Sequence, residues 1–147
     1  MKVEFNKSFI LVVSQIVLVG LHIIIFDYIS TCMLFMLIQI AAVFLSVWSI
    51  YSMKINNLSL SPKVKSNSLL VTKGPYKIIR HPMYASLILY TIPLTIENIQ
   101  LYSIVNQLLI IIILIWKLSY EESLLLKYFD NYFEYTKITY KIIPFLY

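Results

Sequence analysis

The sequence predicts an all-α, polytopic integral membrane protein with about four transmembrane helices and no Rossmann domain. Its 147 residues are 60% hydrophobic and only 13% charged, and the mean hydropathy is +0.81. A soluble domain of this size needs much more polar surface than such a composition supplies. The apolar residues also gather into four runs, and the basic residues all fall on one side of the arrangement that these runs define. The length fits a single domain over residues 1–147.

The first two runs, residues 8–26 and 31–51, predict two N-terminal spans within residues 1–52. The run 8–26 is nearly continuous and long enough to cross a bilayer. It is too long for the core of a signal peptide and lacks a small-x-small cleavage site, so we expect it to be retained as an anchor.

The third and fourth runs, residues 83–96 and 99–116, are separated only by Glu97 and Asn98. So short a connection predicts a tight helical hairpin over residues 83–117. The third run is short for a full span, so we expect it to tilt, to enter the membrane partway, or to be extended by interfacial residues.

Two polar segments flank this hairpin. Residues 52–73 predict a polar loop with a short apolar patch at 69–71. The segment from Tyr120 onward mixes acids, lysines and aromatic residues, which favours an amphipathic helix lying at the level of the lipid headgroups.

The charges predict the orientation. In a four-span arrangement all basic residues lie on one side, namely Lys2, Lys7, Lys54, Lys63, Lys65, Lys73, Lys77, Arg80, Lys117, Lys127, Lys137 and Lys141. The connections on the other side contain only Asp27 and Glu97 as charged residues. Because basic residues accumulate in cytoplasmic segments, both termini are expected in the cytoplasm, and a bacterial chain is expected in the inner membrane.

Other classes of site find little support in the sequence. The net charge of +5 is explained by membrane topology, so we expect no nucleic-acid partner. The single cysteine, Cys32, excludes an internal disulfide and a cysteine-based metal cluster, and we expect no metal site. His22 lies in the first apolar run without a second ionisable residue nearby, which favours a packed or hydrogen-bonded role.

The hairpin predicts a polar cluster at the cytoplasmic membrane surface. The two helices of the hairpin place "RHPMY" (80–84) and "YEE" (120–122) at a similar depth in the membrane. Lys117 and Glu121 are four residues apart and share one helix face. Arg80, His81, Lys117, Glu121 and Glu122 would therefore meet. Ionisable groups at this depth are costly unless paired, which makes the cluster a candidate site.

Simpler interpretations of these residues exist. Pro82 could be the first-turn proline of a helix, with His81 near the cap and Arg80 reaching a lipid phosphate. Glu121 and Glu122 could belong to a solvated helix face. The combination of all these residues at one membrane face favours the site.

About residues 68–147 carry a recognisable pattern. "LVTKGPYKIIRHPMYAS", a tight hairpin and "EESLLLKYFDNYFEYTKITYKIIP" resemble the isoprenylcysteine carboxyl methyltransferase family and its phospholipid methyltransferase relatives. The family pattern is roughly G-x-Y-x-x-x-R-H-P-x-Y-x-G, followed by E-E, a Phe-Gly, a Tyr pair and a terminal Pro. Ser86 and Asp130 stand where that pattern has glycine. Residues 1–52 carry no motif of the family and resemble it only in being apolar spans.

The resemblance implies a membrane-embedded methyltransferase that uses S-adenosylmethionine without a Rossmann domain. His81 and backbone N–H groups at a helix start would suit the cofactor's carboxylate. Glu121 would suit its ammonium or ribose hydroxyls, and Tyr76 and Tyr84 offer ring faces and hydroxyls. The cofactor residues implied are Leu70, Val71, Tyr76, His81, Pro82, Met83, Tyr84 and Glu121.

The resemblance also implies a catalytic set of Lys117, Arg80 and Glu122. Lys117 stands where the family has an acceptor-binding arginine, and it would hold a carboxylate through a point charge. A carboxylate acceptor is already ionised and needs no general base, whereas an amine must lose a proton, for which Glu122 is the candidate. The favoured acceptor is lipophilic, with a carboxylate of the isoprenylcysteine type, and the protein would also contact membrane lipids.

Three alternatives stay open. The first is a phospholipid or amine N-methyltransferase. The second is an NADPH-dependent enzyme similar to the sterol reductases, which share the "Y-K-I-I-P" tail but have Asn at the position of Met83 and many more spans. The third is a non-enzymatic small membrane protein that binds lipid or a partner through its basic loop. Cofactor binding by the purified protein discriminates among them.

Overall fold

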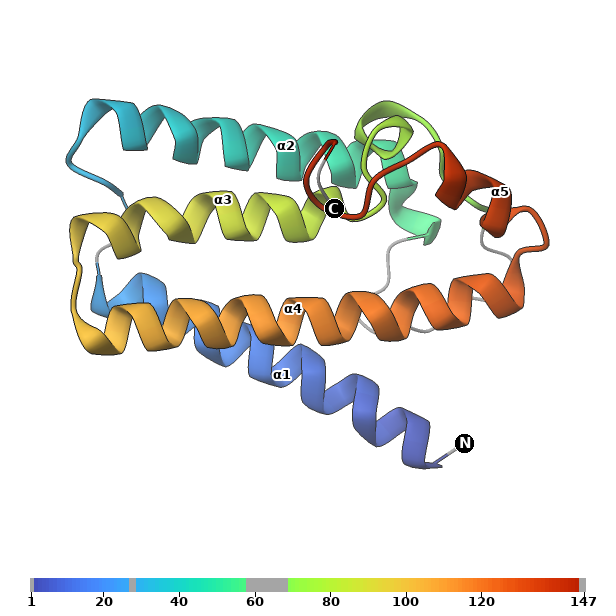
Figure 1. Cartoon of the computed structure of the whole chain (residues 1–147), viewed down its shortest axis with the longest axis horizontal. Helices are drawn as coiled ribbons and strands as arrows, with labels where there is room; N and C mark the ends of the chain where they lie inside the picture. Colours follow the sequence, from blue (N-terminus) through green and yellow to red (C-terminus); the bar gives the residue numbers. More distant parts are fainter. Residues whose placement is uncertain (1, 27–28, 58–68, 146–147) are drawn as a thin grey trace.

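The computed structural model describes the backbone of residues 2–26, 29–57 and 69–145 (Figure 1). The described residues form helices joined by irregular segments and contain no strand, which confirms the all-α prediction; an isolated bridge joins Ile79 to Tyr140. The elements are α1 (Lys2–Ile25), α2 (Met33–Asn57), the 3₁₀-helix η1 (Gly74–Lys77), α3 (Pro82–Glu97), α4 (Leu101–Tyr128) and α5 (Tyr132–Lys137).

Two of these helices are long and apolar enough to cross a membrane. They contain the stretches Met33–Met53 and Leu101–Tyr128, and only 17% and 33% of the residues in their most apolar windows are buried. The core helix of a soluble protein would be mostly buried, so the exposed apolar surface of both helices favours contact with lipid. The apolar part of α1, Phe9–Ile25, and α3 are shorter.

Several predicted boundaries were wrong. The helix predicted for residues 31–51 continues through the start of the predicted polar loop to Asn57. The fourth helix, predicted for 99–116, continues to Tyr128, so the interfacial helix predicted from Tyr120 is reduced to the short α5. The residues from Tyr120 to Tyr128 contain no glycine or proline, and nothing in them stops the helix. The connection at Asp27 and most of the polar loop, with Lys63 and Lys65, lie outside the described residues.

The predicted tight hairpin between α3 and α4 is confirmed. Pro82 is the first residue of α3, where its missing N–H costs nothing, and the backbone and side-chain nitrogens of Asn98 both donate to Leu94 O at 3.1 Å as the helix ends. Gln100 and Ser103 then form a reciprocal capping box that starts α4.

The end of the molecule that holds this hairpin also holds the start of α2, while the N-terminus and α5 lie at the opposite end (Figure 1). Glu97, the last residue of α3, contacts the segment that leads into α2. Its carboxylate accepts hydrogen bonds from the backbone N–H groups of Thr31 (3.1 Å) and Cys32 (2.7 Å), directly ahead of α2. The negative charge therefore lies at the positive end of the α2 dipole.

A polar network fixes α1 against the hairpin. His22 is fully buried, and its Nε2 lies 3.2 Å from Thr91 O and 3.2 Å from Thr95 Oγ1. Asn106 Nδ2 lies 3.0 Å from His22 Nδ1 and 3.2 Å from Leu18 O. The hydrogen-bonded role predicted for His22 is confirmed, and the network sets the register of α1 on α3 and α4.

The core lies among all four long helices. Ile110, Leu114 and Leu118 of α4 are almost fully buried against Tyr84 and Ala85 at the start of α3. Partly buried side chains from α1 and α2, namely Leu18, Val19 and Leu45, pack on this cluster. The core therefore holds the beginning of α3 directly against α4.

Gly74 brings η1 close to α2. It has φ +60°, a left-handed conformation that glycine adopts without strain, and a Cβ at this position would lie 2.3 Å from Ser52 Oγ and 3.2 Å from Trp48 Nε1. The close approach anchors the segment that leads into α3 on the end of α2.

Candidate functional site

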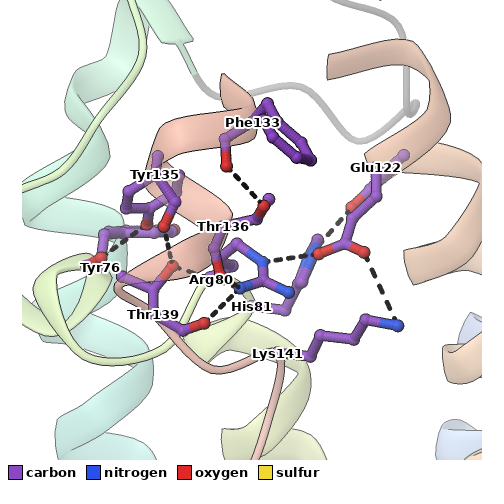
Figure 2. Close-up of polar contacts among 10 residues, drawn as sticks. Tyr76, Arg80, His81, Glu122, Phe133, Tyr135, Thr136, Thr139 and Lys141 are labelled. Atoms are coloured by element: carbon purple, nitrogen blue, oxygen red, sulfur yellow. Dashed lines mark hydrogen bonds and ion pairs between the residues drawn. The ribbon is translucent and has the colours of Figure 1, made fainter. Parts of the chain in front are cut away.

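Arg80 is the centre of a polar cluster directly ahead of α3 (Figure 2). Its side chain is 7% exposed, and its Nε donates to Glu122 Oε1 of α4 at 2.7 Å. Its Nη1 donates to Thr136 O at 3.2 Å and to both the backbone and hydroxyl oxygens of Thr139. The planar guanidinium thus connects the start of α3, α4 and the C-terminal segment.

Backbone hydrogen bonds also join the segment ahead of α3 to the C-terminal segment. Arg80 N donates to Tyr140 O at 2.7 Å, His81 N donates to Lys141 O at 3.0 Å, and Tyr140 N donates to Ile78 O at 3.0 Å. The segment 138–142 is therefore held along the chain that enters α3, which fixes the positions of Arg80 and His81.

His81 lies between two carboxylates. Its Nδ1 is 3.6 Å from Glu121 Oε2 and its Nε2 is 3.5 Å from Glu122 Oε1, distances too long for good hydrogen bonds. His81 is the N-cap residue of α3, but its side chain does not cap the helix, and its buried Nε2 makes no hydrogen bond. The imidazole instead stacks on Tyr84, with 5.4 Å between centroids and 4° between planes.

Glu121 is held by α3. Tyr84 Oη donates to Glu121 Oε1 at 2.5 Å, and both residues line the same pocket. The Tyr84 side chain is buried, so this hydrogen bond fixes the carboxylate where its second oxygen faces His81.

Lys117 lies one helical turn before Glu121 and is only 6% exposed. Its Nζ donates to Gln15 Oε1 of α1 at 2.7 Å and lies 5.1 Å from the centroid of the Tyr84 ring. Both contacts are with neutral groups, an amide oxygen and the face of a ring.

Buried tyrosines support the site from the C-terminal side. Burial raises the pKa of Tyr135 to about 12 and raises the pKa values of Tyr76 and Tyr132 as well, so all three hydroxyls stay protonated near neutral pH. Tyr135 Oη donates to Tyr76 O at 2.5 Å, which ties α5 to η1.

A pocket of about 280 Å³ lies between these elements and receives residues from all four long helices. Its walls are Gln15 of α1, Ser46 and Met53 of α2, Tyr76 of η1, Arg80, His81, Pro82, Met83, Tyr84 and Leu87 around the start of α3, and Lys117 and Glu121 of α4. The charged and titratable groups on its walls are the Glu121 carboxylate, the Lys117 ammonium, the Arg80 guanidinium, the His81 imidazole and two phenols, and Gln15 and Ser46 add neutral polar groups.

The structure brings together most of the predicted residues. The two sequence motifs meet through Arg80–Glu122 and Tyr84–Glu121, as the hairpin predicted. Glu122 faces Arg80 and His81 and does not line the pocket. The remaining predicted residues, Leu70 and Val71, are half-buried and lie outside the pocket lining.

Sequence reasoning missed the contributions of α1 and α2. Gln15, Ser46 and Met53 line the pocket, as does Leu87 of α3. A lone amide in an apolar run, as at Gln15, is a signal that could have indicated a role inside the protein. Met53 gave no such signal, because methionine is ordinary in an apolar segment.

The geometry separates two kinds of binding surface within one pocket. The Glu121 carboxylate, the stacked His81 and Tyr84 rings and Tyr76 offer contacts for a cationic or aromatic ligand. The Lys117 ammonium offers a contact for an anion. Such a pocket suits two ligands of opposite charge character placed next to each other.

Comparison with known proteins and protein families identifies the family of this chain. Neither the curated proteins nor the solved structures contain a match to the chain. A sequence model of the phospholipid methyltransferase family matches residues 26–132, which is most of the chain and includes α2, α3, α4 and both motifs. The chain therefore belongs to the phospholipid methyltransferase family, a family of membrane methyltransferases.

Proposed function

We propose that the protein transfers a methyl group from S-adenosylmethionine to a lipophilic acceptor, with a carboxylate of the isoprenylcysteine type as the favoured acceptor. The observation that carries the proposal is the pocket in which Glu121, His81 and Tyr84 lie beside Lys117. Family membership supports the reaction class, and the pocket supports the assignment of residues.

The residues present fit the cofactor. Glu121 would bind its ammonium or ribose hydroxyls, Tyr76 and Tyr84 would contact its rings, and His81 would bind its carboxylate. The buried His81 Nε2 makes no hydrogen bond and could donate to such a group. Pro82 and Met83 complete this wall, and Leu70 and Val71, in the segment ahead of η1, would contact the cofactor only after a movement toward the pocket. When bound, S-adenosylmethionine supplies an electrophilic methyl group.

The chain's own residues position the acceptor and exclude water. Lys117 would hold an anionic group of the acceptor next to the cofactor wall, since both face one pocket. A carboxylate is already ionised at neutral pH, so no side chain has to accept a proton. The apolar walls from α2 and α3 would keep water away from the reacting atoms.

Glu122 faces Arg80 and His81 and would act one step away from the acceptor, while Arg80 also lines the pocket. Their ion pair at 2.7 Å places His81 and fixes the C-terminal segment, so we assign both residues a positioning role for a carboxylate acceptor. The family match favours a second candidate, a phospholipid amine. An amine must lose a proton, for which Glu122 is the candidate acceptor. Burial raises the pKa of Glu122, but its contacts with His81 and Arg80 outweigh this effect and lower the pKa to about 2, which disfavours this route relative to a carboxylate acceptor.

We further propose that α1 and α3 also enter the membrane, which makes four membrane segments with both termini and the pocket on the cytoplasmic side. Arg80, Lys117 and Lys141 lie around the site at one end of the molecule, while Glu97 lies at the other. Basic residues favour the cytoplasmic side.

Cofactor binding by the purified protein in detergent tests the proposed function. We expect S-adenosylmethionine to bind with micromolar affinity and Glu121→Ala to weaken binding by roughly tenfold or more, the cost of a charge-assisted hydrogen bond. The matched control, Glu134→Ala, removes an exposed carboxylate paired with Lys137 and should leave affinity unchanged. Binding of NADPH in place of S-adenosylmethionine would overturn the proposal.

A further inference from the structure

The strongest feature not explained by either motif is the contact between Lys117 and α1. Gln15 lies outside the residues matched by the family model and outside the motif region, yet its Oε1 accepts the hydrogen bond from Lys117 Nζ at 2.7 Å. Both side chains line the pocket. The first helix therefore supplies the polar partner of the buried ammonium.

This ammonium makes no direct ion pair with a described carboxylate, although Glu121, one turn further along α4, interacts with it electrostatically. Its contacts are the Gln15 amide and the Tyr84 ring, and the nearest acidic residue on its own helix, Glu121, has one oxygen on Tyr84 Oη and the other facing His81. A buried cation with neutral partners keeps an unbalanced charge, because an amide oxygen solvates it without neutralising it. An anion in the pocket would be attracted to this charge.

The position of Gln15 is fixed by the rest of α1. Leu18 O and His22, one and two turns further along the helix, are hydrogen-bonded to Asn106 of α4, and His22 also contacts Thr91 O of α3. These contacts set the register of α1, so Gln15 meets Lys117 in a defined orientation.

We propose that Gln15 is a positioning and specificity-determining residue that holds Lys117 in the pocket without a direct ion pair, and that the pocket thereby selects amphiphiles with an anionic group. The proposal deepens the proposed function and rests on it for the identity of the reaction. The anionic group is a carboxylate or a phosphate, since Lys117 as a point charge binds either. A glutamate in place of Gln15 would pair with Lys117 and cancel the selection.

This inference is tested by measuring the binding of three amphiphiles that share the same hydrocarbon tail and differ in their headgroup. Palmitate, hexadecyl phosphate and hexadecylamine are measured on the full protein in lipid nanodiscs, with empty nanodiscs subtracted. We expect the wild type to bind at least one of the two anions roughly tenfold more tightly than the amine. The palmitate and hexadecyl phosphate arms distinguish a carboxylate from a phosphate headgroup.

Variants of Gln15 then distinguish a role in selecting anionic amphiphiles from a purely structural role. Gln15→Glu should abolish the preference for anions, and the affinity for S-adenosylmethionine and the melting temperature are measured on the same samples. Gln15→Leu should weaken anion binding severalfold without creating a preference for the amine. Ser123→Glu, which adds the same charge on an exposed position of α4, should change neither.

Two results would overturn the inference. One is equal binding of the anions and the amine by the wild type, and the other is anion binding by Gln15→Glu that matches the wild type. Its failure is distinct from failure of the proposed function, because the affinity for S-adenosylmethionine is measured separately on the same samples.

Discussion

Arg80 directs its hydrogen bonds to two elements that are far from it in sequence, Glu122 on α4 and Thr139 in the C-terminal segment. Both members of the ion pair are nearly buried, with 7% and 13% of their side-chain surfaces exposed. Without Arg80, the mostly buried Glu122 would keep only its longer contacts with His81 Nε2 (3.5 Å) and Lys141 Nζ (3.8 Å), which costs more than loss of a surface pair. The arginine of the sequence motif therefore holds the site together.

Arg80→Ala is expected to lower the free energy of unfolding by about 3 kcal/mol, because Glu122 would lose its guanidinium partner. Denaturation of the protein in detergent micelles measures this effect. Lys77→Ala, which removes an exposed basic residue of η1, serves as the control and should cost less than about 1 kcal/mol. Wild-type stability of Arg80→Ala together with lost methyl transfer would instead place Arg80 in contact with the acceptor.

At the residue scale, sequence reasoning predicted contacts that follow from the hairpin. Given two antiparallel helices and a short turn, Arg80 must return near Glu122, and this is observed. The partner of Lys117 could not be predicted in this way, because the placement of Gln15 depends on how α1 packs on α4. That packing is set by buried polar contacts such as His22 with Thr91, which leave no periodic pattern in the sequence.

At the scale of the elements, the connections position the helices that carry the site. η1 lies against the end of α2 through Gly74, and α3 begins a few residues later. At the opposite end Glu97 links the end of α3 to the start of α2. The extensive packing of α2 on α3 is thus fixed at both ends.

Gly74→Ala is expected to destabilise the protein by about 1–3 kcal/mol, because the added Cβ would overlap Ser52 Oγ and the residue would keep a strained positive φ. Gly20→Ala is the matched control, since a Cβ there meets nothing within 4 Å. It should be neutral or should stabilise α1 by up to about 1 kcal/mol. Equal stability of the two variants would show that η1 does not need to approach α2 so closely.

Glu97 should make stability dependent on pH. The hydrogen bond from the Cys32 backbone N–H, with that from Thr31, lowers the pKa of Glu97 below its ordinary value of 4.5. A carboxylate whose pKa is lower in the folded state stabilises the fold above its unfolded pKa, and this contribution disappears as the pH falls through the folded pKa. The stability difference between the wild type and Glu97→Gln should therefore be constant at neutral pH and shrink below about pH 4.5.

Denaturation curves recorded from pH 7 to acid for both proteins measure this difference, and subtraction removes the titration of the other carboxylates. A difference that stays constant down to the acid limit would contradict the cap assigned to Glu97.

The helix boundaries show why elements are harder to predict than their contacts. Residues 120–128 were predicted to lie outside the fourth helix because their composition changes from apolar to mixed. The backbone has no reason to stop there, since a helix can leave an apolar environment without a break when good helix formers follow. α2 likewise continues to Asn57 through residues 52–57, which contain no glycine or proline.

At the scale of the whole molecule, two helix pairs form the protein. α2 packs mainly on α3 and α1 mainly on α4, and the α3–α4 hairpin joins the pairs (Figure 1). The pocket lies where the pairs meet, at the end away from the hairpin turn, and each long helix contributes to its wall. His81, Tyr84 and Glu121 of the two sequence motifs line this pocket together with Gln15 and Lys117.

The proposed reaction is tested by measuring methyl transfer in a membrane. The full protein is reconstituted into vesicles of a bacterial lipid extract with farnesylcysteine added, and it is supplied with S-adenosylmethionine that carries tritium in its methyl group. We expect tritium in the organic-solvent fraction with the wild type and a strong reduction with Glu121→Ala. Release of the label as methanol by mild alkali would identify a methyl ester, and resistance to alkali would identify an N-methylated amine. Absence of tritium from the organic-solvent fraction, with a folded protein present in the vesicles, would contradict the claim that this pocket transfers methyl groups to a lipophilic acceptor.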